Sequence, residues 1–295
     1  MPLSQFAVRA APLIFVFLWS TGFIGAKYGL PYVEPLTFLA MRMGFAVLVH
    51  ALLVWWSGAR MPNASEAGHS VVIGLLVHGV YLGGVFTAIS QGVPAGVSAL
   101  ITGLQPILTS TVANRWLGEK VSGAQWLGLA LGLIGVALVL NDRSLLIAGS
   151  PLGWSANVLS LLGITFGTLY QKRYSGGIDW RSGNLVQYAA AGVFFALGAF
   201  AFETRVVHWN AQLMLALAWL VLGMSLGAVA LMYWLIRRSA AAGFASLFYL
   251  VPVVTALLAY LLFGEKLDAL SIAGMAIAAA GVYVVNRAAA RPLPR

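Results

Sequence analysis

Long apolar stretches, separated by short polar ones, follow one another along the whole chain. A helix needs roughly 20 apolar residues to cross the hydrocarbon core of a bilayer, and most of these stretches reach that length. The polar connections are too short to form a soluble domain. The pattern predicts ten membrane-spanning helices, at about 10–28, 36–57, 69–90, 94–116, 122–140, 153–172, 185–202, 212–236, 240–263 and 267–286.

Part of this pattern occurs twice. Residues 94–140 align without a gap with residues 240–286, which lie 146 positions later. Pro106 aligns with Pro252, and a Gly-Glu-Lys turn follows in both copies. A proline inside a spanning helix removes a hydrogen bond, so we expect each of the two to bend its span.

The duplicated unit would hold five helices, an odd number. The second copy would therefore enter the membrane from the opposite side. Inverted repeats of this kind are typical of transporters, whose binding sites lie between the two halves. The sequence predicts a first five-helix unit at 1–145 and a second, inverted one at 146–295, enclosing a central cavity.

Composition agrees with a membrane protein. Hydrophobic residues make up 61% of the 295 residues and charged residues only 8%, far from the balance of a soluble domain. The fold class expected is all-α and polytopic. The chain has no cysteine, which excludes disulfides and thiolate metal sites, and we expect neither a metal nor a cofactor.

The basic residues lie mostly in alternate loops. One set of loops carries Arg9, Arg60, Arg115, Lys120, Lys172, Arg173, Arg181, Arg237, Arg238, Arg287, Arg291 and Arg295, whereas the other carries Lys27, Arg143, Arg205 and Lys266. Basic loops stay in the cytoplasm, so both termini are predicted to be cytoplasmic and the protein to lie in a plasma membrane, the bacterial inner membrane. The net charge of +9 is then an anchor at an anionic leaflet and indicates no nucleic acid.

Several segments resemble one family. The opening LWSTGFIGAKYGL, Pro35, the Met41-Arg42-Met43 core of the second span and the two Pro…GEK…G…GV blocks are similar to the EamA family of the drug/metabolite transporter superfamily. The resemblance implies two EamA repeats around a central cavity and the export of small metabolites, often amino acids. Amino acid exporters of the YddG type are similar in design, but no site residue is carried over from them.

Polar and aromatic residues at membrane depth are the candidates for contact with a solute. Arg42 could hold a carboxylate through two parallel hydrogen bonds, or cap neighbouring carbonyls. His78 could face a cavity together with Tyr81, or bond to a backbone carbonyl. The substrate-binding residues expected are Trp19, Thr21, Arg42, His78, Tyr81, Thr102, Gln105, Tyr170, Gln187, Tyr233, Trp234, Ser246 and Tyr249.

The acids lie near span ends or in loops, and the phosphate-loop motif GxxxxGK[ST] is absent. We therefore expect a transporter that exports small metabolites, amino acids with aromatic ones among them, by alternating access and without a coupling ion. Transport of phosphorylated sugars or nucleotide-sugars is the alternative, because Arg237 and Arg238 could bind phosphate. An integral membrane enzyme is disfavoured, because no catalytic constellation is found. The partners expected are a small solute and the lipid bilayer, and a monomer is compatible with the sequence.

Overall fold

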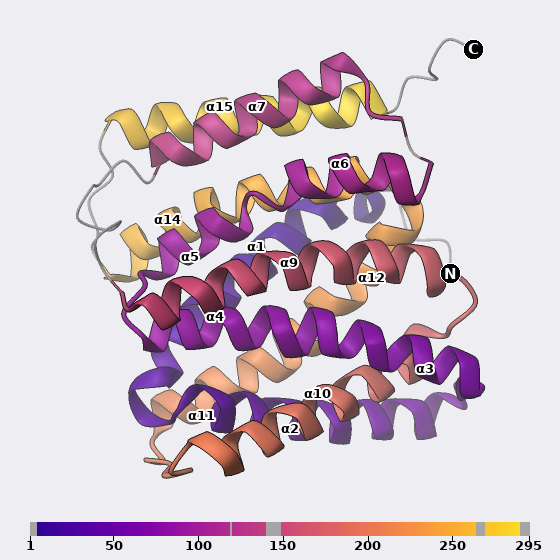
Figure 1. The fold of residues 1–295 in the computed structure, drawn as a ribbon, viewed down its shortest axis with the longest axis vertical. Helices are drawn as coiled ribbons and strands as arrows, with labels where there is room; N and C mark the ends of the chain where they lie inside the picture. The colour runs from indigo at the N-terminus through magenta and orange to yellow at the C-terminus, as the bar shows by residue number, and fades with distance from the viewer. Residues whose placement is uncertain (1–4, 119, 140–148, 264–268, 290–295) are drawn as a thin grey trace.

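The computed structural model describes residues 5–118, 120–139, 149–263 and 269–289 (Figure 1). Within them the secondary structure is helical, apart from one isolated β-bridge between Val33 and Val207. The α-helices are α1 (Gln5–Gly29), α2 (Pro35–Ser57), α3 (Ala64–Ile73), α4 (Tyr81–Ser90), α5 (Ala95–Thr102), α6 (Gln105–Trp116), α7 (Gly123–Val139), α9 (Pro151–Tyr174), α10 (Trp180–Phe202), α11 (Ala211–Trp219), α12 (Val229–Arg238), α13 (Ala241–Ser246), α14 (Leu250–Phe263) and α15 (Ala269–Ala289). The other helices are the 3₁₀ turns η1 (Leu30–Tyr32) and η4 (Leu247–Tyr249) and the π-helices η2 (Gly74–Val80) and η3 (Leu220–Ala228).

Seven helical stretches of the described residues are long and apolar enough to cross a membrane: Ala10–Tyr32, Pro35–Ser57, Ala64–Ser90, Pro151–Tyr174, Trp180–Phe202, Ala211–Arg238 and Ala241–Leu262. Two further apolar helices, Gly123–Leu138 and Ile272–Ala288, are shorter. The stretch 94–116 forms two helices, α5 and α6, instead of one. The expectation of an all-α polytopic protein is therefore confirmed, while the described residues do not confirm the number of ten spanning helices.

Pro106 and Pro252, which align in the duplicated segments, each follow an interruption of their helix. α5 ends at Thr102, and Pro106 lies in the first turn of α6. Pro252 follows the 3₁₀ turn η4 in the same way. Since proline donates no backbone hydrogen bond and its ring clashes with the preceding turn, the helix must adjust just before it. The two interruptions stand at matching places in the duplicated segments.

The π-helices are also duplicated. η2 begins at Gly74 and η3 at Leu220, 146 positions later, which is the offset of the duplicated segments. A π-helix widens the helix by one residue and turns side chains to a new direction, often at a functional site. η2 contributes His78 and η3 contributes Ser225 to the centre of the molecule.

Helix ends are defined by local capping. Asn63 and Glu66 form a reciprocal capping box at the start of α3, and Ser150 caps α9, whose first residue is a proline. α2 ends at Ser57 because Gly58 adopts a left-handed φ of 59°. These signals place the polar turns at the two ends of the helices.

The helices form a stack in which α2 and α10 lie at one end and α7 and α15 at the other (Figure 1). Both end pairs join one helix from each half of the chain. Glycines allow the α7–α15 contact, since a Cβ on Gly135 would lie 2.3 Å from the backbone nitrogen of Ala278. Between the end pairs, α4 packs on α9, and α1 packs on α11 and η3.

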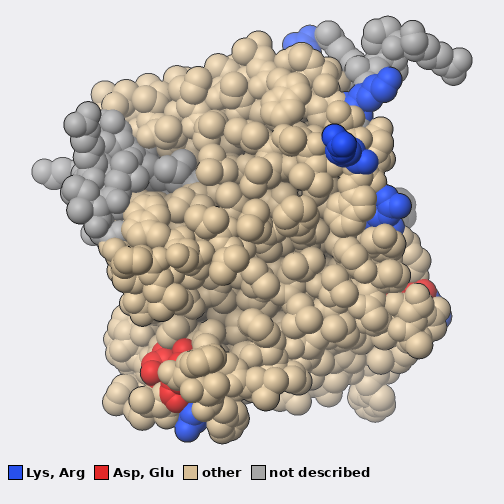
Figure 2. Space-filling view, viewed as in Figure 1, with Lys and Arg blue, Asp and Glu red and all other residues tan. Residues whose placement is uncertain are grey.

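The charged residues gather at two opposite edges of the stack (Figure 2). We call the edge with the loops before α3, α7, α10 and α13 the basic edge, because it carries Arg115, Lys120, Arg173, Arg237 and Arg238. The opposite edge, where Glu34 and Glu203 lie, is the acidic edge. The start of α1 and the end of α15 are both at the basic edge (Figure 1).

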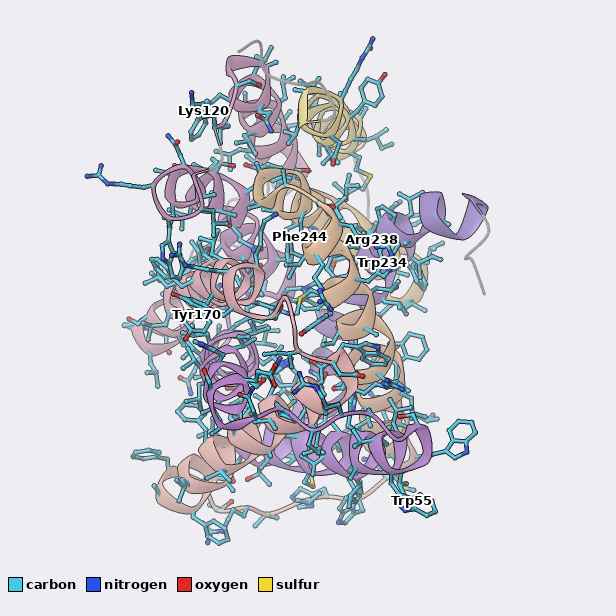
Figure 3. The ribbon with its side chains drawn as sticks, turned by 90° about the vertical axis from the view of Figure 1, so that its right-hand side faces the viewer. Trp55, Lys120, Tyr170, Trp234, Arg238 and Phe244 are labelled. Carbon is cyan, nitrogen blue, oxygen red and sulfur yellow. The ribbon has the colours of Figure 1, made fainter. Side chains whose placement is uncertain are left out.

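The surface between the edges is apolar. Leu48 and Leu52, in the middle part of α2, are 60% and 64% exposed. Trp55, in the last turn of α2, also projects outward from the helices, whereas Phe244 lies among them (Figure 3). An exposed apolar belt of this kind is stable only against lipid.

Candidate functional site

A small cavity lies at the centre of the stack, between the two halves of the chain. It is lined by Trp19, Gly22 and Phe23 of α1, Arg42 of α2, Val77 and His78 of η2, Tyr81, Leu82, Val85 and Phe86 of α4, Met224 of η3 and Val229 of α12. Its free volume is ≈ 20 Å³, which is room for a water molecule but not for an organic solute. The centre of the molecule is therefore closed to an organic solute in this structure.

Arg42 is the charged group of this cavity. Its side chain is 3% exposed, and Nε donates to Ser225 Oγ at 3.3 Å. Ser225 in turn donates to the carbonyl of Leu220, and its own carbonyl accepts from the Tyr188 hydroxyl at 2.5 Å. This network holds the guanidinium in place across α2, η3 and α10.

Arg42 has no carboxylate partner among the described residues. The described acids lie at helix ends with partners of their own: Glu34, Glu66, Asp179 and Glu203. A cation taken out of water is costly unless an anion and hydrogen bonds compensate it. Since Arg42 lines the cavity, an anionic group of a bound solute would supply the missing compensation.

Two rings pack on each other beside this cation. The His78 and Tyr188 rings have centroids 4.6 Å apart, and Gln187 lies near His78. His78 Nε2 is buried without a partner in the described part of the chain. Such an orphaned polar atom beside a cavity is a candidate for contact with water or a ligand.

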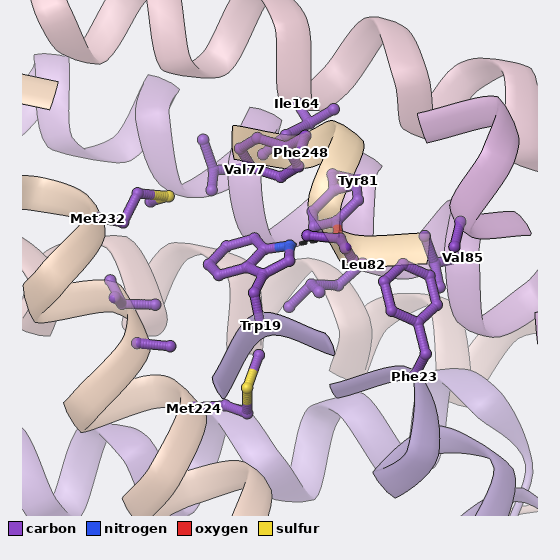
Figure 4. Close-up of a cluster of buried hydrophobic side chains, with 14 of the residues drawn as sticks. Trp19, Phe23, Val77, Tyr81, Leu82, Val85, Ile164, Met224, Met232 and Phe248 are labelled. Atoms are coloured by element: carbon purple, nitrogen blue, oxygen red, sulfur yellow. Dashed lines mark hydrogen bonds between the residues drawn. The ribbon is translucent and has the colours of Figure 1, made fainter. Parts of the chain in front are cut away.

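Trp19 and Tyr81 form the aromatic wall. Trp19 Nε1 donates to the Tyr81 hydroxyl at 3.1 Å, and the rings are stacked with centroids 6.1 Å apart (Figure 4). Met224 packs on the other side of Trp19, next to Gly22, where a Cβ would lie 2.8 Å from the methionine methyl. The wall is thus aromatic and apolar around one cationic group, an arrangement that suits a small organic anion or zwitterion.

Aromatic side chains close the cavity toward the acidic edge. Phe38 and Phe86 pack edge to face at 5.6 Å. Phe86 lines the cavity, whereas its neighbour Thr87 lines an open cleft of about 850 Å³ at the acidic edge. The Phe38–Phe86 pair therefore lies between cleft and cavity.

A second aromatic group closes the cavity toward the basic edge. Phe15, Phe244 and Phe248 pack on one another with centroids 5.6 to 5.8 Å apart, and we call them the basic-edge aromatic cluster. Phe248 also packs edge to face on Trp19, at 5.6 Å. The central cavity thus has an aromatic barrier on each side.

The residues expected at the site divide into those that line this cavity and those that do not. Trp19, Arg42, His78 and Tyr81 line it, and Gln187 lies next to His78. The remaining ones lie elsewhere, in contacts of their own: Thr21 with Trp219, Thr102 with backbone carbonyls of α5, Gln105 with Thr168, Tyr170 with His69, Tyr233 with carbonyls of Ser175 and Ile178, Trp234 with Arg238, Ser246 with Asn286, and Tyr249 with Gly132.

Sequence reasoning did not place Ser225 or Met224 at the centre. Both lie in a uniformly apolar stretch, where no polar or apolar periodicity marks the face that the π-helix η3 turns inward. Arg237 and Arg238 are anchored at the basic edge, over the rings of Tyr233 and Trp234, and Arg237 also donates to the Gly176 carbonyl. This geometry favours anchoring over phosphate binding for the two arginines.

Several known proteins are similar to this chain in sequence, and one solved structure is similar in fold. The chain is 26% identical over 269 residues to the Escherichia coli protein named uncharacterized inner membrane transporter YedA, covering 91% of this chain and 87% of that one. It is 23% identical over 282 residues to an E. coli protein named probable amino-acid metabolite efflux pump, with 92% of each chain covered. A crystal structure of a protein 20% identical matches with a TM-score of 0.79 over 97% of this chain and 98% of that one, which supports the fold alone.

The two halves of the chain each match one family. The EamA-like transporter family matches residues 9–141 and again residues 152–287, so that the duplication is one of whole family units. The protein is a membrane transporter and belongs to the EamA-like transporter family.

Proposed function

We propose that this transporter exports small metabolites that carry a carboxylate, amino acids above all, across the bacterial inner membrane. The observation that carries the proposal is Arg42: a buried cation at the wall of the central cavity, with no carboxylate partner among the described residues. A guanidinium binds a carboxylate through two parallel hydrogen bonds. The relative named as an amino-acid metabolite efflux pump supports the same solute class.

Alternating access is supported by the two aromatic barriers. Opening the Phe38–Phe86 pair would join the cavity to the cleft at the acidic edge. Opening the basic-edge aromatic cluster would join it to the other side. Two inverted five-helix units, at 1–145 and 146–295, would give two equivalent conformations of this kind. The exchange of helix partners between the halves and the duplicated π-helices support this arrangement.

The basic edge would face the cytoplasm, with both termini on that side, because short basic loops are retained there. The solute would then load from the basic edge and leave through the cleft at the acidic edge. Within the described residues, the acids are at helix ends, so that no carboxylate is at hand at membrane depth to bind a coupling ion. We infer movement of the solute down its own gradient.

Counterflow in proteoliposomes tests the proposal. Vesicles loaded with L-phenylalanine should accumulate labelled L-phenylalanine without a pH or sodium gradient, and phenylalaninamide, which lacks the carboxylate, should compete poorly. Arg42→Gln should reduce counterflow at least about tenfold, because a charge-assisted hydrogen bond is worth roughly 1.5–3 kcal/mol. Arg238→Gln, which removes an equivalent charge at the surface, is the matched control. Equal competition by the amide, or full activity of Arg42→Gln, would contradict the proposal.

A further inference from the structure

A second, smaller cavity lies between the centre and the basic edge. It is lined by Thr109 of α6, Thr168, Leu169 and Lys172 of α9, Ile236 of α12, and Ala241 and Phe244 of α13. Its free volume is ≈ 10 Å³, enough for about one water molecule. Phe244 belongs to the basic-edge aromatic cluster, so this cavity lies on the far side of that cluster from Trp19.

Buried polar atoms without partners surround this space. Thr109 is 2% exposed, and its hydroxyl has no hydrogen-bond partner among the described residues. Gln105, one turn earlier on α6, donates to Thr168 Oγ1 at 3.1 Å, while its Oε1 is left without a partner in the described chain. A buried polar atom without a partner costs roughly 1–3 kcal/mol, so such atoms indicate a site that water or a ligand occupies in some state.

Lys172 supplies a positive charge to the same cavity. Its ammonium group donates to the carbonyl of Ser239, in the turn that joins α12 to α13. An ammonium group has three donors, so it can hold an anion while it bonds to a carbonyl. Hydroxyl and ammonium donors side by side are the groups that bind a carboxylate.

The matching place in the other half of the molecule keeps the threonine and lacks the other polar groups. Thr109 aligns at the offset of 146 with Thr255, whose hydroxyl is also buried without a partner in the described chain. Lys172 aligns with Ala26, Thr168 with Gly22 and Gln105 with Val251. At the related contact between α1 and α14, the small Gly22 and the apolar Val251 pack the helices together, so packing alone does not require the polar residues Thr168 and Gln105. The positive charge of Lys172 and the polar groups of Gln105 and Thr168 are therefore specific to the contact between α6 and α9, on the side that reaches the basic edge.

We propose that this cavity is a loading station: a second binding site for the carboxylate of the solute, occupied at the basic edge before the basic-edge aromatic cluster opens toward Arg42. It rests on the proposed function, since the solute is the same. The station forms fully when α13 moves away from α6 and α9, which enlarges the space beside Thr109 and Lys172. Export then passes the carboxylate from Lys172 to Arg42.

Cysteine labelling tests the station directly, because the natural chain has no cysteine and a single introduced thiol is the one reactive site. Thr109→Cys is combined with Arg42→Gln, so that binding at the central cavity is removed. L-phenylalanine should slow labelling of this thiol by a membrane-impermeant maleimide added at the basic edge, and phenylalaninamide should not. Asn114→Cys, exposed on the same helix, is the control and should react at an unchanged rate.

A second comparison applies if the Arg42→Gln protein does not fold. In it, Thr109→Cys with Lys172→Gln is compared with Thr109→Cys alone, and Arg42 is intact in both. The phenylalanine concentration for half protection should rise about tenfold, as for the loss of a charge-assisted hydrogen bond, while Arg173→Gln should leave it unchanged. Absence of protection in the Arg42→Gln background, or equal protection by the amide, would mean that the cavity holds water only and would overturn the station. Wild-type counterflow is measured beside it: its absence contradicts the proposed function, whereas counterflow without protection contradicts the station alone.

Discussion

The chemistry of the central cavity depends on a few polar and charged side chains that are buried away from water. Arg42 is buried among apolar and aromatic side chains and donates a hydrogen bond to Ser225. Such an isolated cation would destabilise the fold unless it were compensated in part of the transport cycle. The same residue that weakens the resting structure is thus the one suited to select an anion.

The aromatic wall should decide which solutes are preferred. Tyr81→Ala removes the ring stacked on Trp19 in the cavity, and should lower phenylalanine counterflow several-fold relative to alanine, because an aromatic pair contributes roughly 0.5–1.5 kcal/mol. Tyr233→Ala is the matched control, since its hydroxyl bonds to carbonyls at the basic edge. It should lower thermal stability and leave the phenylalanine-to-alanine ratio unchanged. An identical ratio of phenylalanine to alanine counterflow in the wild type and in Tyr81→Ala would show that the aromatic wall does not contact the solute.

The sequence predicted the depth of residues better than the direction in which they point. Arg42, His78 and Tyr81 were recognised because polar groups at membrane depth are costly, and all three line the cavity. Tyr170 was expected there for the same reason, but it packs on His69 and Tyr174 instead. A helix that is apolar on every side gives little indication of which face is inward, so only the packing of the helices decides.

At the scale of helices, the duplication governs the irregular geometry as well as the regular one. The two prolines predicted a bend in each of two spans, and in both spans the structure has a helix interruption just before the proline. The paired π-helices η2 and η3 were not predicted, because a π-turn depends on tertiary contacts more than on local residues. Gly74, at the start of η2, lets the backbone of α10 approach at Gln187.

Gly74→Ala should therefore destabilise the protein. The added Cβ would lie 2.4 Å from the Gln187 carbonyl oxygen, which forces two backbones apart at a cost of about 1–3 kcal/mol. Gly44→Ala is the control, since a Cβ there meets nothing within 4 Å, and it should be neutral or stabilising by up to about 1 kcal/mol. Thermal unfolding in detergent measures both. A Gly74→Ala protein as stable as Gly44→Ala would contradict the close approach of η2 and α10.

The acidic edge is held by carboxylates that cross between helices. Glu34 accepts from the Thr204 hydroxyl at 2.7 Å and from two backbone N–H groups, and the Thr204 bond is the main reason that the pKa of Glu34 lies below its ordinary value of 4.5. A lowered pKa in the folded state stabilises the fold above the ordinary pKa and is lost as the pH falls through the folded value.

The difference in melting temperature between the wild type and Glu34→Gln should thus be largest near pH 7 and should shrink as the pH falls below 4.5, because the carboxylate of the folded protein becomes protonated in that direction. A difference that stays constant with pH would show that the charge of Glu34 does not hold the edge.

At the scale of the whole molecule, we expect the basic edge and the acidic edge to lie on opposite sides of the membrane. The expected orientation puts the basic edge in the cytoplasm. In intact cells, a cysteine at Ser90, near the acidic edge, should react with an impermeant maleimide, whereas one at Asn114, near the basic edge, should react after the membrane is opened. Both positions are at helix ends or exposed. The reverse pattern would invert the direction of transport that we propose.

The central claim is that the cavity around Arg42 opens to each edge in turn. Leu82 lines this cavity and is 8% exposed, so Leu82→Cys places a single thiol between the two aromatic barriers of an otherwise cysteine-free chain. The measurement is the rate of its reaction with a small, impermeant thiol reagent added to one side of sealed vesicles and then to the other. We predict reaction from both sides, slowed from both by L-phenylalanine. Reaction from one side alone, whatever the direction of the phenylalanine gradient, would contradict alternating access at this site.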